Sequence, residues 1–191
     1  MQKIYIVNKN EFISQDIILK AKIDQIKLDK QKDKQLFVFT QLLEKYILNG
    51  RERLIGEFGK PYTDKGSRYN ISQVGDYVVA IESDKECGVD IVDKRAFDEH
   101  FKSRIYKKSE NIASDEDAQR VWSIKEACLK CVGIGLKGLF DVEIISKDEV
   151  KYKDQVFEYR TIMYDNYAIS ICMKNGIEDV SLVKLTLKDI I

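Results

Sequence analysis

The chain has 191 residues, 44% of them hydrophobic and 34% charged, which is enough to bury a core in one domain or in two small lobes. Its 32 Lys and Arg residues balance its 32 Asp and Glu residues, so net charge favours neither a nucleic-acid nor a membrane partner. No apolar run is long enough to span a bilayer, and residues 1–3 do not begin a signal peptide. Four cysteines without framework spacing indicate reduced thiols, so we expect a cytoplasmic protein.

The first fifty residues are predicted to form a strand and two helices. Residues 3–7 alternate like a strand, residues 13–23 are predicted as a short helix, and residues 33–48 form an amphipathic helix that Asn49-Gly50 ends. The basic stretch between these helices is either a solvated face or a group of lysines that reaches the phosphates of a ligand; its members are Lys27, Lys30, Lys32 and Lys34.

The segment Phe58-Gly59-Lys60-Pro61 predicts a turn, because glycine frees the backbone and proline restricts it. It is either a plain loop before a hairpin or a loop that contacts a ligand. Residues 69–72 and 77–81 then predict two strands joined by a turn at Gly75-Asp76.

One acid interrupts an apolar strand at residues 88–92, with the sequence GVDIV. Alternation turns Val89 and Ile91 to one side and Asp90 to the other. A carboxylate there is costly to bury without a partner. Asp90 is therefore either an acid at a strand end or one half of a metal site.

A helix is predicted from the capping signal at Ser114 to the stop at Gly133. Glu126 lies one turn after Trp122 and one turn before Lys130, so these three side chains share a flank beside the apolar stripe. The pair of Glu126 and Lys130 is either an ordinary surface pair or suited to hold a metal-bound phosphate. A divalent cation shared by Asp90 and Glu126 would satisfy both acids.

The remaining features carry less chemistry. Cys128 and Cys131 form a C-x-x-C pair, which is either a redox pair or, as we expect, two buried thiols. The single histidine, His100, lies outside any motif. Four strands are predicted after residue 138, and we expect them to form the sheet of a second lobe; they span residues 142–146, 155–163, 167–173 and 180–187.

Several of these segments together resemble the signatures of the 4′-phosphopantetheinyl transferase superfamily. The G-[IV]-D and W-x-x-K-E-A-x-x-K signatures stand here as Gly88-Val89-Asp90 and as residues 122–130. The segments FGKPY at 58–62 and YNISQVGDYVVA at 69–80 resemble signatures of the larger, surfactin-synthetase-activating type. Gly133-Ile134-Gly135-Leu136 matches the G-x-G-L of the family, so the similarity spans about residues 30–140 in the correct order.

The resemblance implies an α+β fold of two similar lobes related by a pseudo-twofold axis, residues 1–85 and 86–191, with the active site between them in a monomer. It implies a holo-[acyl-carrier-protein] synthase type of activity. Such an enzyme moves the phosphopantetheine arm of coenzyme A onto a serine of an acyl or peptidyl carrier protein with Mg²⁺, and it releases adenosine 3′,5′-bisphosphate. The residues do not indicate which carrier protein is served.

The resemblance also implies roles for individual residues. Asp90 and Glu126 would hold Mg²⁺, Glu126 and Lys130 would act in catalysis, and Glu110 would be the general base, directly or through water. The residues expected to contact coenzyme A are Lys45, Phe58, Gly59, Lys60, Pro61, Ser72, Gln73, Asp90, Lys125 and Lys130.

The chain departs from the family pattern at two places. The family usually has Ser-His where this chain has Ser72-Gln73, and glutamine can donate a hydrogen bond but carries no positive charge. Many relatives place a second carboxylate at the position of Val92, and Asp93 could replace it only through a bulge. On the sequence alone, Glu110 is also simply one acid in a charged linker. These points leave open a homologue that binds coenzyme A without catalysis, or a scaffold that binds a carrier protein and needs no coenzyme A.

Overall fold

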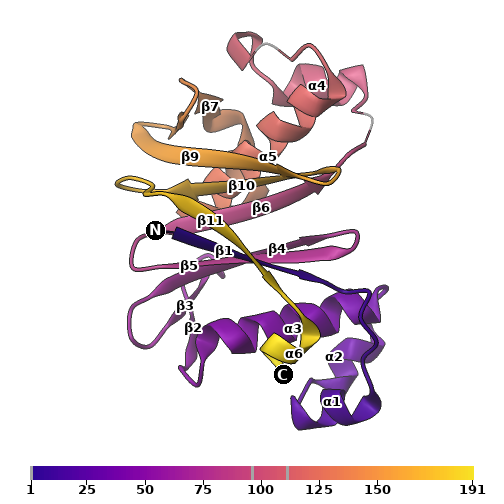
Figure 1. Ribbon diagram of the computed structural model, residues 1–191. Coiled ribbons are helices and arrows are strands. Elements are labelled where there is room, and N and C mark those ends of the chain that lie inside the picture. Colours follow the sequence, from indigo (N-terminus) through magenta and orange to yellow (C-terminus); the bar gives the residue numbers. More distant parts are fainter. Residues whose placement is uncertain (1, 96, 111) are drawn as a thin grey trace.

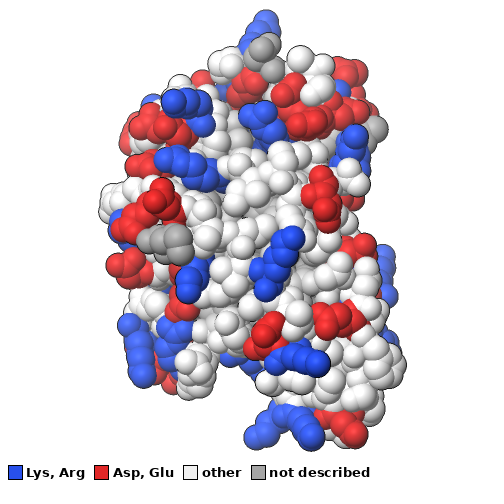
Figure 2. All heavy atoms as spheres, viewed as in Figure 1, with Lys and Arg blue, Asp and Glu red and all other residues white. Residues whose placement is uncertain are grey.

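The computed structural model describes residues 2–95, 97–110 and 112–191. These residues form four layers (Figure 1). Two β-sheets face each other in the middle, and helices cover the outer face of each sheet. This α+β arrangement of two sheets confirms the expected fold class. On the face drawn in Figure 2, acidic and basic side chains are interspersed, in keeping with the balanced composition.

The first sheet has the strand order β11-β1-β5-β4-β3-β2. Its strands are β1 (Gln2–Asn8), β2 (Arg53–Ile55), β3 (Pro61–Thr63), β4 (Arg68–Val74), β5 (Tyr77–Ser83) and β11 (Val180–Leu185). All neighbouring pairs are antiparallel except β1 and β11, which are parallel. The helices on this side of the molecule are α1 (Gln15–Lys20), α2 (Gln25–Asp29), α3 (Lys34–Leu48) and α6 (Leu187–Ile190).

The second sheet has the order β6-β10-β9-β8-β7 and is antiparallel throughout. Its strands are β6 (Cys87–Asp93), β7 (Val142–Ile144), β8 (Glu149–Tyr152), β9 (Gln155–Tyr164) and β10 (Tyr167–Met173). The helical segments of this half are α4 (Glu99–Ile105), α5 (Asp115–Val132) and two 3-10 helices, η1 (Lys108–Glu110) and η2 (Gly135–Asp141).

Alternate side chains of the two sheets point toward each other and pack into one shared core. Ile4 and Val79 from the first sheet pack with Val89 and Ile169 from the second. The opposite faces carry the helices: Phe39 and Leu43 of α3 pack into a core with the first sheet, and α5 packs against the second. Because Asp90 alternates with Val89, its side chain faces the helix α5.

The ends of α3 and α5 follow their capping residues. Ser114 accepts a hydrogen bond from the backbone N–H of Asp117 at the start of α5, and Gly133 ends that helix at a φ of 86°. Asp33 caps α3 in the same way, and Asn49 ends it in the left-handed region. These ends confirm the predicted helices.

The last strand differs from the prediction. Residues 180–185 do form a strand, but β11 pairs in parallel with β1 in the first sheet instead of extending the second. The chain therefore enters the second sheet at β6 and returns to the first sheet for β11, which α6 follows. Six further elements are not predicted from the sequence, namely β2, β3, β8, α2, α4 and α6. No helix among the described residues is long and apolar enough to cross a membrane.

Candidate functional site

Asp90, Ser72 and Lys130 meet where the two sheets and α5 come together. The Lys130 ammonium lies 2.6 Å from Oδ1 of Asp90 and donates to the Ser72 hydroxyl at 2.8 Å. The Ser72 hydroxyl in turn donates to the same Asp90 oxygen at 2.8 Å. Strand β4 thus supplies Ser72, strand β6 supplies Asp90, and α5 supplies Lys130. The structure brings these three predicted site residues together.

Burial sets the electrostatics of this cluster. Asp90 is only 6% exposed, and its burial raises the pKa of the carboxyl, although Lys130 and Ser72 favour the charged form. The Lys130 side chain is 27% exposed, so its ammonium lies between the buried acid and solvent. The cluster is therefore a buried anion with one accessible cation.

Glu126 belongs to the same region. Burial and, after it, the negative charge of Asp90 raise the pKa of Glu126 to about 7, although the charge of Lys130 opposes this. The described part of the chain gives Glu126 no hydrogen-bond or ion-pair partner. Asp90 and Glu126 are consequently two carboxylates that repel each other beside a single lysine.

These two acids suit a divalent cation by their chemistry. No group of three or more His, Cys, Asp and Glu side chains that could hold a metal ion occurs within residues 2–95, 97–110 and 112–191. Mg²⁺ nevertheless often takes only one or two carboxylates, with waters and substrate phosphates as its other ligands. A cation would also relieve the repulsion that raises the pKa of Glu126. The donor set therefore fits magnesium if phosphate oxygens complete it.

Lys125 and Glu110 do not join this cluster, contrary to what the sequence led us to expect. The Lys125 ammonium lies 2.8 Å from Oε1 of Glu110, and both side chains are closed to solvent. Lys125 also donates to the backbone carbonyls of Ile105 and Val142 at 3.0 and 3.2 Å. Its side chain is therefore enclosed by residues on the far side of α5 and does not lie over a pyrophosphate beside Asp90.

Glu110 is also held by the backbone around it. Its carboxylate accepts hydrogen bonds from the N–H groups of Lys107 at 2.8 Å and Ile144 at 3.3 Å. Glu110 is therefore not the exposed linker acid that the sequence alone suggested. The charge of Glu110 is used inside the protein.

The loop at residues 58–61 lies against the C-terminal end of α5. Phe58, Lys60 and Pro61 line a cavity of about 510 Å³ together with Glu86 and Gly133. The Lys60 ammonium donates to Glu86 and to the backbone carbonyl of Cys131, at 2.6 Å in each case. Gly59 adopts a φ of 84°, which allows this turn. The cavity is lined by Cys131, which follows Lys130 in α5, but by no residue of the Asp90 cluster itself.

Gln73 follows Ser72 and is exposed at the end of β4. Thr40 of α3 donates a hydrogen bond to the side-chain oxygen of Gln73. At the position where the family usually has histidine, this chain thus has a neutral glutamine whose hydrogen-bond partner is also neutral.

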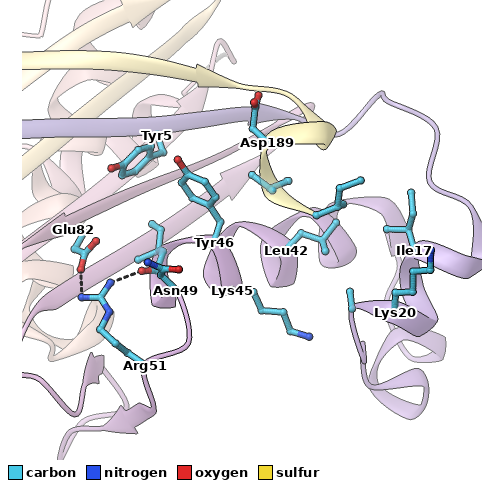
Figure 3. Close-up of a pocket in the computed structure, with 14 residues that line it drawn as sticks. Tyr5, Ile17, Lys20, Leu42, Lys45, Tyr46, Asn49, Arg51, Glu82 and Asp189 are labelled. Carbon is cyan, nitrogen blue, oxygen red and sulfur yellow. Dashed lines mark hydrogen bonds and ion pairs between the residues drawn. The ribbon is translucent and has the colours of Figure 1, made fainter.

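Lys45 lies elsewhere. It is one of the residues that line a cavity of about 720 Å³ between α1, α3, α6 and β1, shown in Figure 3 with Tyr5, Ile17, Lys20 and Tyr46. The structure does not bring Lys45 to the Asp90 cluster. The lysines of the basic stretch at residues 27–34 are exposed, and two of them pair with nearby acids, Lys27 with Asp24 and Lys34 with Asp29.

The strand that carries Asp90 is regular up to its end. Val92 is buried in an apolar cluster with Phe97 and Ala118, so no second carboxylate is available there. The pairing of β6 with β10 runs without a bulge to Asp93, which therefore faces away from Asp90. Asp93 is not brought to the site as a replacement ligand. All four cysteines are free and buried.

Sequence reasoning missed the residues that hold the site together. Asn70, which accepts a hydrogen bond from the Val89 N–H, lies inside the resembled segment 69–80 but was given no role there, and Thr40 carried no signal beyond its polarity in an amphipathic helix. Glu86, which binds both Lys60 and Arg68, precedes the Asp90 strand by one residue and could have been noticed as an acid at a strand start.

Comparison with known proteins supports the resemblance drawn from the motifs. Residues 86–172 match the 4′-phosphopantetheinyl transferase superfamily. The 4′-phosphopantetheinyl transferase gsp of Aneurinibacillus migulanus is 25% identical over 150 residues, which are 70% of this chain and 63% of that protein. The chain thus spans less than two thirds of that relative's length. The holo-[acyl-carrier-protein] synthase of Thermotoga maritima is 20% identical, with a TM-score of 0.37 over 48% of this chain and 64% of that one.

The match to the 4′-phosphopantetheinyl transferase superfamily covers the Asp90 strand, α5 and all but the last residue of β10, so this part of the chain is similar to that superfamily. The upstream motifs and the similarity to gsp point to the larger, surfactin-synthetase-activating type of that superfamily.

Proposed function

We propose that this protein transfers the 4′-phosphopantetheine arm of coenzyme A to a serine of an acyl or peptidyl carrier protein, releasing adenosine 3′,5′-bisphosphate. The observation that carries the proposal is the cluster of Asp90, Lys130 and Ser72 at the junction of the two sheets, with Glu126 beside it. A pair of acids next to an accessible ammonium is suited to bind a polyphosphate together with a divalent cation.

In the proposed site, Asp90 and Glu126 hold Mg²⁺ with phosphate oxygens and water. When bound, the ion would neutralise negative charge on the pyrophosphate and on the leaving group. Lys130 binds the same phosphates, because its ammonium is the accessible cation of the cluster. Ser72 orients both Asp90 and Lys130 through its hydroxyl.

The loop at residues 58–61 and its cavity are the proposed place for the nucleotide part of coenzyme A. Phe58 and Pro61 line the cavity and offer apolar contacts there, with Gly59 in the same loop, and Ser72 and Gln73 lie on strand β4. Lys60 is one of three cations that line that cavity, with Arg68 and Lys174, although Glu86 binds both Lys60 and Arg68. Lys45 is not included in the proposed site.

We propose a structural role for the Lys125–Glu110 pair in place of phosphate binding and general-base catalysis. A base must reach the proton that it removes, and a carboxylate with no solvent exposure that binds a lysine does not reach a substrate serine. The pair instead ties η1 and the segment after α4 to the middle of α5.

The protein is further proposed to act as a monomer in the cytoplasm, without nucleic acid or membrane. Two lobes in one chain already form the proposed site, and four buried free thiols suit a reducing compartment. An alternative is that the protein binds coenzyme A without transferring its arm. This alternative is suggested by Gln73, which replaces the histidine of the family, and by Val92, which replaces a second carboxylate.

One experiment separates these functions. The protein is incubated with Mg²⁺, coenzyme A and a panel of apo acyl and peptidyl carrier proteins, and the carrier mass is measured. Transfer adds the mass of phosphopantetheine to one or more carriers. We expect Glu126→Gln to abolish the addition while the fold is retained; full activity in that variant would reject the metal assignment. Calorimetry that shows coenzyme A binding with no mass addition would favour the non-catalytic homologue, and no binding would favour a carrier-binding scaffold.

A further inference from the structure

Strand β6, which carries Asp90, is an edge strand of the second sheet. One edge pairs with β10, with Asp90 opposite Ser170 and Gly88 opposite Cys172. In an antiparallel pair, alternate residues turn their N–H groups away from the partner strand. Val89 and Ile91 turn theirs toward the first sheet, where an edge strand would otherwise leave them without acceptors.

Two side chains of β4 accept these N–H groups. Oδ1 of Asn70 accepts from Val89 at 3.0 Å, and the Ser72 hydroxyl accepts from Ile91 at 3.4 Å. Residues 70 and 72 lie on one face of β4, and residues 89 and 91 on one edge of β6, so each rung joins residues 19 apart. The two strands are thereby aligned in the same direction and in one register.

The opposite side of β6 permits little adjustment. A Cβ atom on Gly88 would lie 2.1 Å from the carbonyl oxygen of Ala127 and 2.4 Å from the Cys131 nitrogen, so the strand touches the backbone of α5. A shift of β6 along β4 by one residue would also turn Asp90 away from α5. Register at this junction therefore decides whether Asp90 meets Lys130.

We propose that Asn70 is a positioning residue for the site. With Ser72 it forms two side-chain-to-backbone rungs that hold β6 in register with β4, so that Asp90 is presented to Lys130 and Glu126. Asn70 is 8% exposed, and its acceptor is used inside the protein, which distinguishes it from a residue that contacts substrate. The reaction that it would support is the transfer proposed above, but the register can be tested without that reaction.

The test uses Asn70→Val, which removes the acceptor, and Asn70→Ser, which restores an oxygen of the kind that Ser72 presents. The control is Ile71→Ala: Ile71 is the next residue, but it packs into the core on the other face of β4. Amide hydrogen exchange at Val89 is followed by NMR, and the apparent Mg²⁺ and coenzyme A affinities and kcat/KM of transfer are measured well below each melting temperature.

We expect the Val89 amide of the natural protein to be protected, and to exchange about tenfold faster or more in Asn70→Val, with Asn70→Ser between them. The same order is expected for kcat/KM, whereas Ile71→Ala should lower the melting temperature and leave kcat/KM unchanged. The proposal would be overturned if the Val89 amide of the natural protein exchanged as fast as the amide of a solvent-exposed edge strand. It would also be overturned if Asn70→Val left kcat/KM unchanged. If the natural protein shows no transfer to any carrier, the proposed function fails, and exchange at Val89 with the Mg²⁺ affinities still decides the inference.

Discussion

Lys125 and Glu110 form an ion pair that solvent does not reach: the Nζ–Oε1 distance is 2.8 Å, and both side chains are 0% exposed. The lysine lies in the middle of α5 and the glutamate in η1, at the end of the segment that follows α4. Removing one partner of such a pair leaves a buried charge, which costs far more than the pair contributes when intact.

We therefore expect Glu110→Gln to lower the free energy of unfolding by about 3 kcal/mol, because the buried Lys125 amine would lose its counter-charge. The double variant Lys125→Met, Glu110→Gln should recover much of that loss, since it removes both charges. Urea denaturation of the two single variants and the double variant measures the coupling. A Glu110→Gln protein with unchanged stability but no transfer activity would instead restore Glu110 as a general base.

Lys130 is the one cation in contact with the buried Asp90 carboxylate, among the residues that the structure describes. Lys130→Met should lower the free energy of unfolding by about 1 to 3 kcal/mol, because it leaves Asp90 unpaired at a site where burial already raises its pKa. Mg²⁺ should then restore stability in this variant more than in the natural protein, since a divalent cation would take over the role of the ammonium. Thermal unfolding with and without Mg²⁺ checks this.

Glu126→Gln in the Lys130→Met background provides the control for that experiment. The double variant retains only Asp90 of the two proposed ligands, and its melting temperature should respond to Mg²⁺ much less. An equal response in both variants would show that the ion binds elsewhere.

The sequence indicated the elements of the site more securely than its contacts. Ser114 and Gly133 delimit α5 because capping chemistry is local, and alternation alone turns Asp90 toward the helix. Lys125 and Lys130 differ by about 140° around a helix of 3.6 residues per turn, so periodicity already separates their directions. It was the resemblance to the family, and not the periodicity, that placed both of them over one pyrophosphate.

Long-range choices could not be predicted in the same way. The apolar pattern of residues 180–185 predicts a strand, but nothing in it distinguishes the edge at β1 from an edge of the second sheet. The pairing of Glu110 with Lys125 depends on how η1 folds back onto α5. Asn70 was unrecognised for the same reason, because its partner is a backbone N–H 19 residues away.

Glu86 links the loop at residues 58–61 to the start of β6. Its partial burial opposes ionisation, but Lys60 and Arg68 outweigh this and hold the pKa of Glu86 below its ordinary value of 4.5. A carboxyl with a depressed pKa contributes stability above that ordinary value and loses it as the pH falls through the folded-state pKa. Glu86→Gln should therefore lower stability at pH 7 by less than about 1 kcal/mol, because the side chain is 41% exposed.

The difference between this variant and the natural protein should shrink toward zero as the pH falls below 4.5, which a series of urea titrations would show. Glu57→Gln, at the exposed residue just before this loop, is the matched control and should change stability little. A difference that persists unchanged at low pH would mean that the Glu86 charge does not support the loop.

Gln73 presents a neutral side chain where relatives of the resembled type carry histidine. If Ser72-Gln73 lies beside the 3′-phosphate of coenzyme A, Gln73→His should tighten coenzyme A binding by about three- to tenfold at pH 6, where an imidazole of ordinary pKa near 6.5 is mostly charged. The gain should fade at pH 8, and 3′-dephospho-coenzyme A should show no gain at either pH. Calorimetry with both ligands measures this, with Gln73→Asn as the neutral control. Equal gains for the two ligands would place the 3′-phosphate away from residue 73. The hydrogen bond from Thr40 to Gln73 would then only fix the end of strand β4 and would not orient a side chain that contacts the ligand.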